Sequence, residues 1–152
     1  AVRPGRSGSL PGLVAGLEAQ EVDLGDSEQI EDLFAAARPT LVYHLATGTP
    51  QTSVALQDPF SGEWLCDIHN LVRLLDVARR YRPEIKALVR TGSLAEYGSA
   101  SAPSREDERE TPVTLHGTAL AAATHYLHYA AHDLPFAAYT ARLGLTYGPG
   151  QR

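Results

Sequence analysis

Residues 40–46, TLVYHLA, form a continuous apolar run of the length of one β-strand. A run without alternating polar residues is typical of a strand in a parallel sheet that is buried on both faces. A loop rich in Thr, Gln and Ser follows, and then residues 62–81, in which apolar side chains recur at helical spacing. A strand followed by a long helix indicates a crossover connection, because a hairpin needs only a short turn.

The same alternation continues downstream. KALVRTG at residues 86–92 is the next predicted strand, and FAAYTARLG at residues 136–144 is the last. Between them lie a charged loop, SREDERE at 104–110, which we expect to be solvated, and an Ala-rich predicted helix over residues 115–132.

The upstream part of the chain has this pattern as well. AQEVDL at residues 19–24 is a short predicted strand, and Asp26 or Ser27 is the predicted cap of a helix that Pro39 ends. Strands that alternate with helices require a parallel sheet with helices on both faces. The sequence therefore predicts an α/β fold, a doubly wound parallel sheet of the Rossmann-like kind.

The composition is that of an ordinary globular protein. At 152 residues the chain is long enough for one domain with a single hydrophobic core. A net charge of -5 and scattered arginines provide no basic stripe for a nucleic acid, and no apolar run has the length that a membrane span needs. The single cysteine, Cys66, fits a cytoplasmic location, and we expect it to pack against the sheet.

Ligands of open parallel sheets bind at the carboxyl ends of the strands, where loops converge and helix N-termini point toward the crevice. The residues at the predicted strand ends are Asp23 and Leu24, Ala46 to Gly48, Thr91 to Ser93, and Leu143 to Tyr147.

Motifs at these same places resemble those of the extended short-chain dehydrogenase/reductases, the NAD-dependent epimerases and dehydratases that act on nucleotide sugars. The matching segments, in the order of the family, are VDLGD at 22–26, VYHLAT at 42–47, TGSLAEYG at 91–98, ETP at 110–112 and RLGLTYGPGQ at 142–151. Each segment is weak alone, but five in the right order and spacing are specific. The resemblance covers nearly the whole chain and implies NAD or NADP as the cofactor and a nucleotide sugar as the substrate.

The resemblance also implies roles for individual residues at the cofactor site. Asp23, followed by Leu24, corresponds to the segment whose Asp contacts the adenine amino group. Leu45, Ala46 and Thr47 correspond to the segment that packs against the adenosine and pyrophosphate. The alternative for Asp23 is a turn residue at a strand end, and for Ala46 and Thr47 it is simple packing.

Ser93 stands four residues before Tyr97, where the family has its catalytic Ser or Thr. Two interpretations of Ser93 stay open. It is either the hydrogen-bonding partner of a reacting hydroxyl or a loop residue that caps its own backbone.

The chain departs from the family at the catalytic helix, which in the family opens with Tyr-x-x-x-Lys. The segment here is HGTAL, with His116 in place of the Tyr and Leu120 in place of the Lys. The single lysine, Lys86, has Arg82 four residues before it, so this pair does not exist in any register. His116 is either a degenerated position or a replacement acid/base that pairs with Ser93, since an imidazole titrates near neutral pH without help.

Two functions therefore remain open. The first is an NAD(P)-dependent epimerase-, dehydratase- or ketoreductase-like protein that keeps its dinucleotide cleft but lacks the usual proton-transfer pair. The alternative is a catalytically inactive pseudoenzyme that serves as a dinucleotide-binding or dimerisation module, with residues 62–81 and 115–132 as the dimer helices that the resemblance implies. No metal site is expected, because His125, His128 and His132 share one helix face and are interpreted as a solvent-side stripe.

The two ends of the chain have the character of internal boundaries. The chain contains no Met, opens on a Pro/Gly/Ser-rich stretch and closes just after the last predicted strand. By comparison with the family, we expect residues 1–152 to be a partial NAD(P)-binding domain, without the first βαβ unit and its Gly-rich loop and without the C-terminal substrate region. If these residues were the whole gene product, we would expect an exposed apolar sheet edge, poor solubility and no dinucleotide binding.

Overall fold

The computed structural model describes residues 16, 18–46, 58, 60, 63–81, 84–99 and 103–147. Its elements in chain order are helix α1 (Ser27–Ala37), strand β1 (Leu41–His44), the 3₁₀ turn η3 (Glu63–Leu65), helix α2 (Cys66–Arg80), strand β2 (Ala87–Ser93), the 3₁₀ turn η4 (Leu94–Glu96), helix α3 (Leu115–Ala130) and strand β3 (Ala137–Leu143). This sequence of elements confirms the predicted alternation from the first helix onward.

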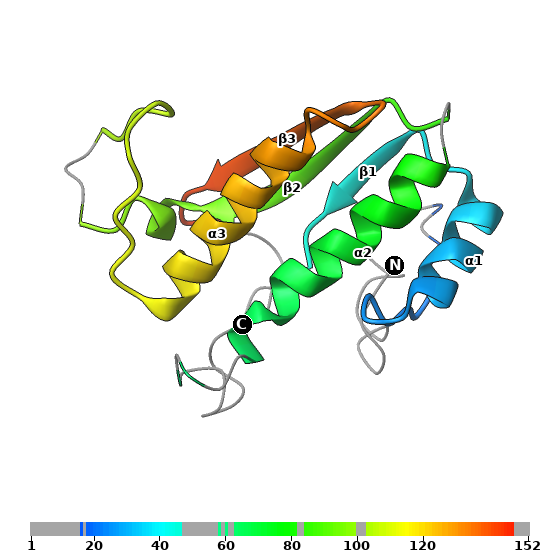
Figure 1. Ribbon diagram of the computed structural model, residues 1–152, viewed down its shortest axis with the longest axis horizontal. Helices are drawn as coiled ribbons and strands as arrows, with labels where there is room; N and C mark the ends of the chain where they lie inside the picture. The colour runs from blue at the N-terminus through cyan, green and yellow to red at the C-terminus, as the bar shows by residue number, and fades with distance from the viewer. Residues whose placement is uncertain are drawn as a thin grey trace.

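The three strands form one parallel sheet in the order β1-β2-β3. Because the order runs in one direction, right-handed crossovers place α2 and α3 on the same face of the sheet. Figure 1 shows these two helices side by side in one layer, with α1 next to α2. The predicted parallel, Rossmann-like sheet is therefore confirmed, and the described helices supply one of the two helix layers of a doubly wound fold.

A single apolar core lies between the sheet and the three helices. It is formed by Ile30 and Phe34 of α1, Leu71, Leu74, Leu75, Val77 and Ala78 of α2, Leu88 of β2, and Ala123 and Leu127 of α3, together with Val22, Ile85 and Phe136. More of these side chains come from α2 than from any other element, because this helix packs against α1 on one side and against α3 on the other. Burial of this apolar surface is the main force that holds the helices on the sheet.

Three expectations about local structure were wrong. Residues 19–24 do not form a strand: within them only Glu21 makes a single bridge. Strand β1 is not buried on both faces: Leu41 and Tyr43 are 52% and 64% exposed, because they alternate with Val42 and His44 and point to the face that the described helices do not cover. Cys66 is exposed, because it is the first residue of α2 and lies before the part of the helix, Leu71 to Ala78, that supplies the core residues.

Candidate functional site

The carboxyl ends of the three strands and the N-termini of the three helices lie on the same side of the molecule (Figure 1). This follows from the parallel crossovers, since each helix returns the chain to the start of the next strand. Leu45 and Ala46 directly follow β1 at this edge and are both exposed, and Ser93 is the last residue of β2. Thr47, which the sequence also placed here, lies outside the described residues.

Asp23 lies in the turn that leads into α1. Its carboxylate accepts a hydrogen bond from the backbone N–H of Gly25 at 2.8 Å, and its own N–H donates to the side chain of Gln29 at 3.0 Å. The next acidic residue, Asp26, is the N-cap of α1, one of the two caps that the sequence predicted. Asp23 therefore stabilises the turn while its side chain remains exposed to solvent.

Ser93 is held by hydrogen bonds on both its side chain and its backbone. Its Oγ accepts from the N–H of Ala95 at 3.1 Å, and its own N–H donates to Oε1 of Glu96 at 3.0 Å. The two bonds form a capping box around η4. The backbone-capping geometry is thus present, and it leaves the hydroxyl hydrogen of the half-buried Ser93 without an acceptor among the described residues.

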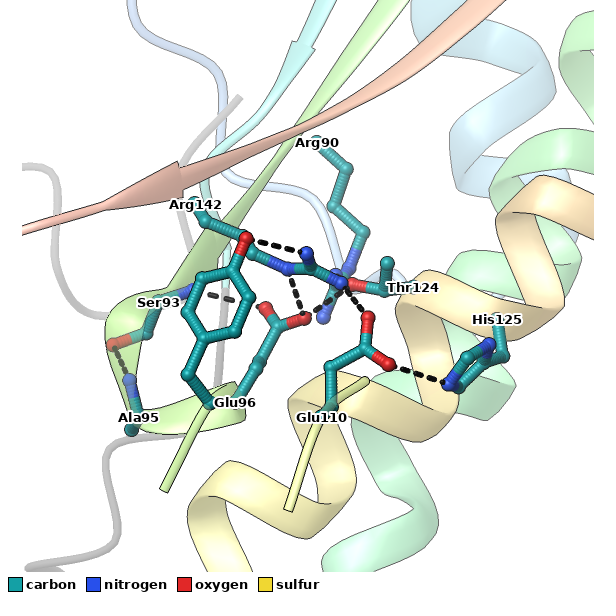
Figure 2. A network of polar contacts seen from close by, with 9 residues as sticks. Arg90, Ser93, Ala95, Glu96, Glu110, Thr124, His125 and Arg142 are labelled. Atoms are coloured by element: carbon teal, nitrogen blue, oxygen red, sulfur yellow. Dashed lines mark hydrogen bonds and ion pairs between the residues drawn. The ribbon is translucent and has the colours of Figure 1, made fainter. Parts of the chain in front are cut away.

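A network of charged side chains lies directly behind Ser93 (Figure 2). Oε2 of the fully buried Glu96 accepts from Oγ1 of Thr124 at 2.8 Å and from Nε of Arg142 at 2.9 Å. Arg142 also donates to the hydroxyl of Tyr97 at 2.8 Å, forms an ion pair with Glu110, and lies with its guanidinium carbon 4.7 Å from the centre of the Tyr97 ring. The network joins η4, α3, β3 and the loop before α3.

The charges in this network stabilise one another. Burial alone would lower the pKa of Arg142, but hydrogen bonds to Glu96 and Tyr97 and the nearby carboxylates raise it above its ordinary value. Burial would raise the pKa of Glu110, but its backbone hydrogen bond and the charge of Arg142 lower it overall. Both groups therefore stay charged at neutral pH.

The position of Glu110 corrects the expectation that the whole loop at 104–110 is solvated. Its side chain is only 12% exposed, because it turns inward to Arg142 while its other oxygen lies 3.3 Å from Nε2 of His125. For Glu96 and Arg142 the sequence predicted no role. One local signal was available for Glu96, since Ser93 and Glu96 have the S-x-x-E spacing of a capping box.

A second buried polar pair lies on the helix-covered face of the sheet. His44 of β1 and Arg90 of β2 are register partners, 4% and 1% exposed. Burial, and then the charge of Arg90, lower the pKa of His44 from 6.5 to about 4, while Asp67 partly opposes this. Arg90 donates to Oγ1 of Thr124 at 3.3 Å and so connects this pair to the Glu96 network.

His116 and Leu120, which the sequence predicts in place of the family's catalytic pair, lie in the first turns of α3. His116 is half-buried, and no hydrogen bond joins it to Ser93, although the structure describes both residues. Leu120 is only 2% exposed. Turn η4 packs closely on this end of α3, since a Cβ on Gly117 would lie 2.4 Å from the carbonyl oxygen of Ala95. Leu120 therefore occupies a buried position near this contact.

The predicted histidine stripe is exposed: His125 and His128 lie on α3, and His132 lies in the turn that follows it. Within the described ranges, no group of three or more His, Cys, Asp or Glu side chains could hold a metal ion. The same part of the chain contains no helix with the length and apolar character that crossing a membrane requires.

Comparisons with known proteins place these features in a family. The model of the NAD dependent epimerase/dehydratase family matches residues 2–152. No curated protein matches the chain by sequence.

Solved structures resemble the chain over most of its length. The UDP-glucose 4-epimerase of Thermotoga maritima, solved with UDP-glucose, is 25% identical with a TM-score of 0.80, over 99% of this chain and 48% of that one. The Thermus thermophilus UDP-glucose 4-epimerase in complex with NAD is 26% identical with a TM-score of 0.77, over 97% and 47%. The nucleoside-diphosphate-sugar epimerase of Agrobacterium tumefaciens is 25% identical with a TM-score of 0.70, over 91% and 42%. The chain spans about half the length of the solved structures it matches.

Proposed function

This chain belongs to the NAD dependent epimerase/dehydratase family, and from that premise we propose that it forms part of the NAD(P)-binding domain of a protein that binds a nucleotide sugar. The observation that carries the proposal is the carboxyl edge of the parallel sheet. The sequence motifs of the family fall at this edge, and it is where ligands of such sheets bind. Solved relatives in complex with NAD and with UDP-glucose support the same ligands here.

The described part of this edge fits a dinucleotide in two respects. Leu45 is 65% exposed and, with Ala46, offers an apolar surface suited to an adenine ring. The exposed carboxylate of Asp23 is an acceptor for an adenine amino group. Thr47 is proposed to contact the same ligand. A bound nicotinamide would supply hydride transfer at a sugar carbon.

Ser93 is the residue we propose to contact the sugar. Its Oγ already accepts from Ala95, so its hydroxyl hydrogen is available to donate to a sugar oxygen. A donated hydrogen bond from a fixed hydroxyl would orient the reacting carbon and stabilise negative charge on the oxygen. Proton transfer would then depend on His116, because the chain has no Tyr-x-x-x-Lys pair.

The burial of Leu120 favours a second candidate, a pseudoenzyme that binds the dinucleotide without turnover. In the family the corresponding Lys holds the nicotinamide ribose, whereas Leu120 is packed and apolar. Without that anchor the nicotinamide is poorly positioned for hydride transfer. Such a protein would act through ligand binding or through a dimer formed by residues 62–81 and 115–132.

The first experiment is calorimetric titration of the full-length protein with NAD and with NADP. We expect Asp23→Ala to weaken dinucleotide binding roughly tenfold, the loss of one hydrogen bond to a charged acceptor. Asp32→Ala, at an exposed position of α1, is the matched control and should bind like the wild type. If neither dinucleotide binds the wild type, the proposal is wrong.

Turnover of UDP-glucose separates the two candidates once binding is established. Turnover that is lost in His116→Ala, with dinucleotide affinity unchanged, would support a replacement acid/base. Binding without turnover in the wild type would support the pseudoenzyme, and its oligomeric state, measured by light scattering, would test the dimer. Turnover that survives in His116→Ala would exclude His116 from the chemistry.

A further inference from the structure

Glu96 is a buried carboxylate that three different elements contact. Its side chain is 0% exposed and accepts hydrogen bonds from the N–H of Ser93 at the end of β2, from Thr124 of α3 and from Arg142 of β3. A carboxylate without solvent keeps its charge only when such donors compensate for lost hydration. Burial of the Glu96 carboxylate is therefore unfavourable unless its three hydrogen bonds are formed, which indicates a role beyond filling space in the turn.

The carboxylate also packs directly against the backbone of β2. A Cβ on Gly92 would lie 2.1 Å from Oε1 of Glu96 and 2.9 Å from Cγ2 of Thr140. Only glycine leaves room for the carboxylate at this point. The last residues of β2, including Ser93, therefore rest on Glu96.

The two oxygens of Glu96 have different partners. Oε1 holds the N–H of Ser93 at 3.0 Å, while Oε2 takes Thr124 and Arg142 at 2.8 and 2.9 Å (Figure 2). The side chain of Ser93 is fixed in the same turn, because Oγ accepts from the N–H of Ala95 at 3.1 Å. One capping box therefore fixes both the backbone and the hydroxyl of Ser93. The second oxygen of Glu96 connects this capping box to α3 and β3.

We propose that Glu96 is a positioning residue that sets the direction of the Ser93 hydroxyl toward the sugar of a bound nucleotide sugar. The proposal rests on the proposed function, in which Ser93 contacts that sugar. Thr124 and Arg142 transmit the positions of α3 and β3 to the turn through the same carboxylate. The Ser93 hydroxyl, which donates to the sugar, therefore has a fixed orientation before the ligand binds.

Substitution of Glu96 by Gln removes the negative charge and replaces one acceptor oxygen by an NH₂ group, and so tests the contribution of both. A glutamine has one acceptor oxygen, so its NH₂ must face either the N–H of Ser93 or the two donors on the other side. We expect the oxygen to stay with Thr124 and the charged Arg142, so the N–H of Ser93 loses its acceptor while shape and volume are kept. Arg142 retains Glu110 as its partner in the variant, which limits the damage to the fold.

Amide hydrogen exchange in the full-length protein, followed by NMR, measures the positioning without any ligand. We expect Glu96→Gln to speed exchange at Ser93 and at Ala95 by about tenfold, because both donors depend on the capping box. Thr111→Val is the control: it removes a hydrogen bond to the carbonyl oxygen of Tyr97, next to the same turn, but no hydrogen bond joins Thr111 to Glu96 or Ser93. Equal acceleration in the control would mean general loosening and would overturn the proposal.

A double-mutant cycle then tests whether Glu96 affects UDP-glucose binding through Ser93. The dissociation constant of UDP-glucose is measured in the presence of NAD for the wild type, Ser93→Ala, Glu96→Gln and the double variant. We expect each single change to weaken binding by about threefold to tenfold, and the double variant to bind no worse than Ser93→Ala. Additive losses would show that Glu96 does not act through Ser93. Failure of the wild type to bind UDP-glucose would instead refute the proposed function, while the exchange experiment would still decide whether Glu96 positions Ser93.

Discussion

The buried imidazole of His44 makes the stability of this protein depend on pH in a direction that can be worked out. The side chain is 4% exposed, and neither ring nitrogen has a hydrogen-bond partner among the described residues. Burial, followed by the charge of Arg90, lowers its pKa from 6.5 to about 4. The folded protein therefore favours the neutral ring, whereas the unfolded chain takes up a proton as the pH falls below the ordinary histidine pKa.

Acidification consequently lowers the free energy of unfolding. Proton uptake by the unfolded chain alone reduces it by about 2 kcal/mol at about pH 5 and by about 3 kcal/mol at about pH 4, relative to neutral pH. The contribution of the neutral ring is fully present above the unfolded pKa and is lost as the pH falls toward the folded one. His44→Leu removes this dependence and should cost little at neutral pH, because the nitrogens it removes have no partner.

Urea unfolding of the wild type and His44→Leu at about pH 7 and about pH 5 measures the effect. Other acid-sensitive contacts are common to both proteins, so the difference in free energy of unfolding should shift by about 2 kcal/mol in favour of the variant. His69→Leu, at an exposed position of α2, is the control, and its free energy of unfolding should fall as much on acidification as that of the wild type. If His44→Leu loses as much stability as the wild type on acidification, the burial argument is refuted.

Leu120→Lys puts an ammonium at a position that is 2% exposed, and we expect urea unfolding to show a loss of about 3 kcal/mol or more, against about 1 kcal/mol for Leu120→Met. Gly92→Ala places a Cβ 2.1 Å from Oε1 of Glu96 and should lower the Tm, whereas Gly144→Ala, whose nearest neighbour would be at 3.5 Å, should leave it unchanged. Thr114→Ala removes the side-chain acceptor at the start of α3 and should cost about 1 kcal/mol in urea unfolding, while Thr114→Ser should retain most of that stability. An equal effect of both substitutions in any of these pairs would contradict the contact that the pair tests.

The sequence could predict those elements whose signal is local. Strand β2 and helix α2 follow from apolar runs and from helical spacing, and Asp26 caps α1 because its side chain reaches the next backbone donors. Residues 19–24 carry a similar short apolar signal but make only one bridge. A strand needs a partner along its length, and that partner is set by distant parts of the chain.

The same distinction applies to the candidate site. The strand-end positions of Ser93, Leu45 and Ala46 could be read from the sequence, because parallel topology alone brings strand ends together. The contacts of Arg142 could not, since its partners Glu96 and Glu110 are 46 and 32 residues away in the chain. No spacing rule relates side chains so far apart, and only the packing of α3 against β3 and η4 brings them together.

The close approach of Gly98 to Thr111 has a consequence for how this region can change during evolution. Oγ1 of Thr111 donates to the carbonyl oxygen of Tyr97 at 3.1 Å, and a Cβ on Gly98, which has a φ of +66°, would lie 1.9 Å from the carbonyl oxygen of Thr111. The described residues 103–109 lie between these contacts and are mostly exposed, and the chain returns to the domain at Glu110 and Thr111. Because the cost of closing a loop grows only slowly with its length, residues can be inserted or deleted there while the strand end and α3 stay in place. We expect residues 103–109 to tolerate length variation, and an inserted tag, with little loss of stability.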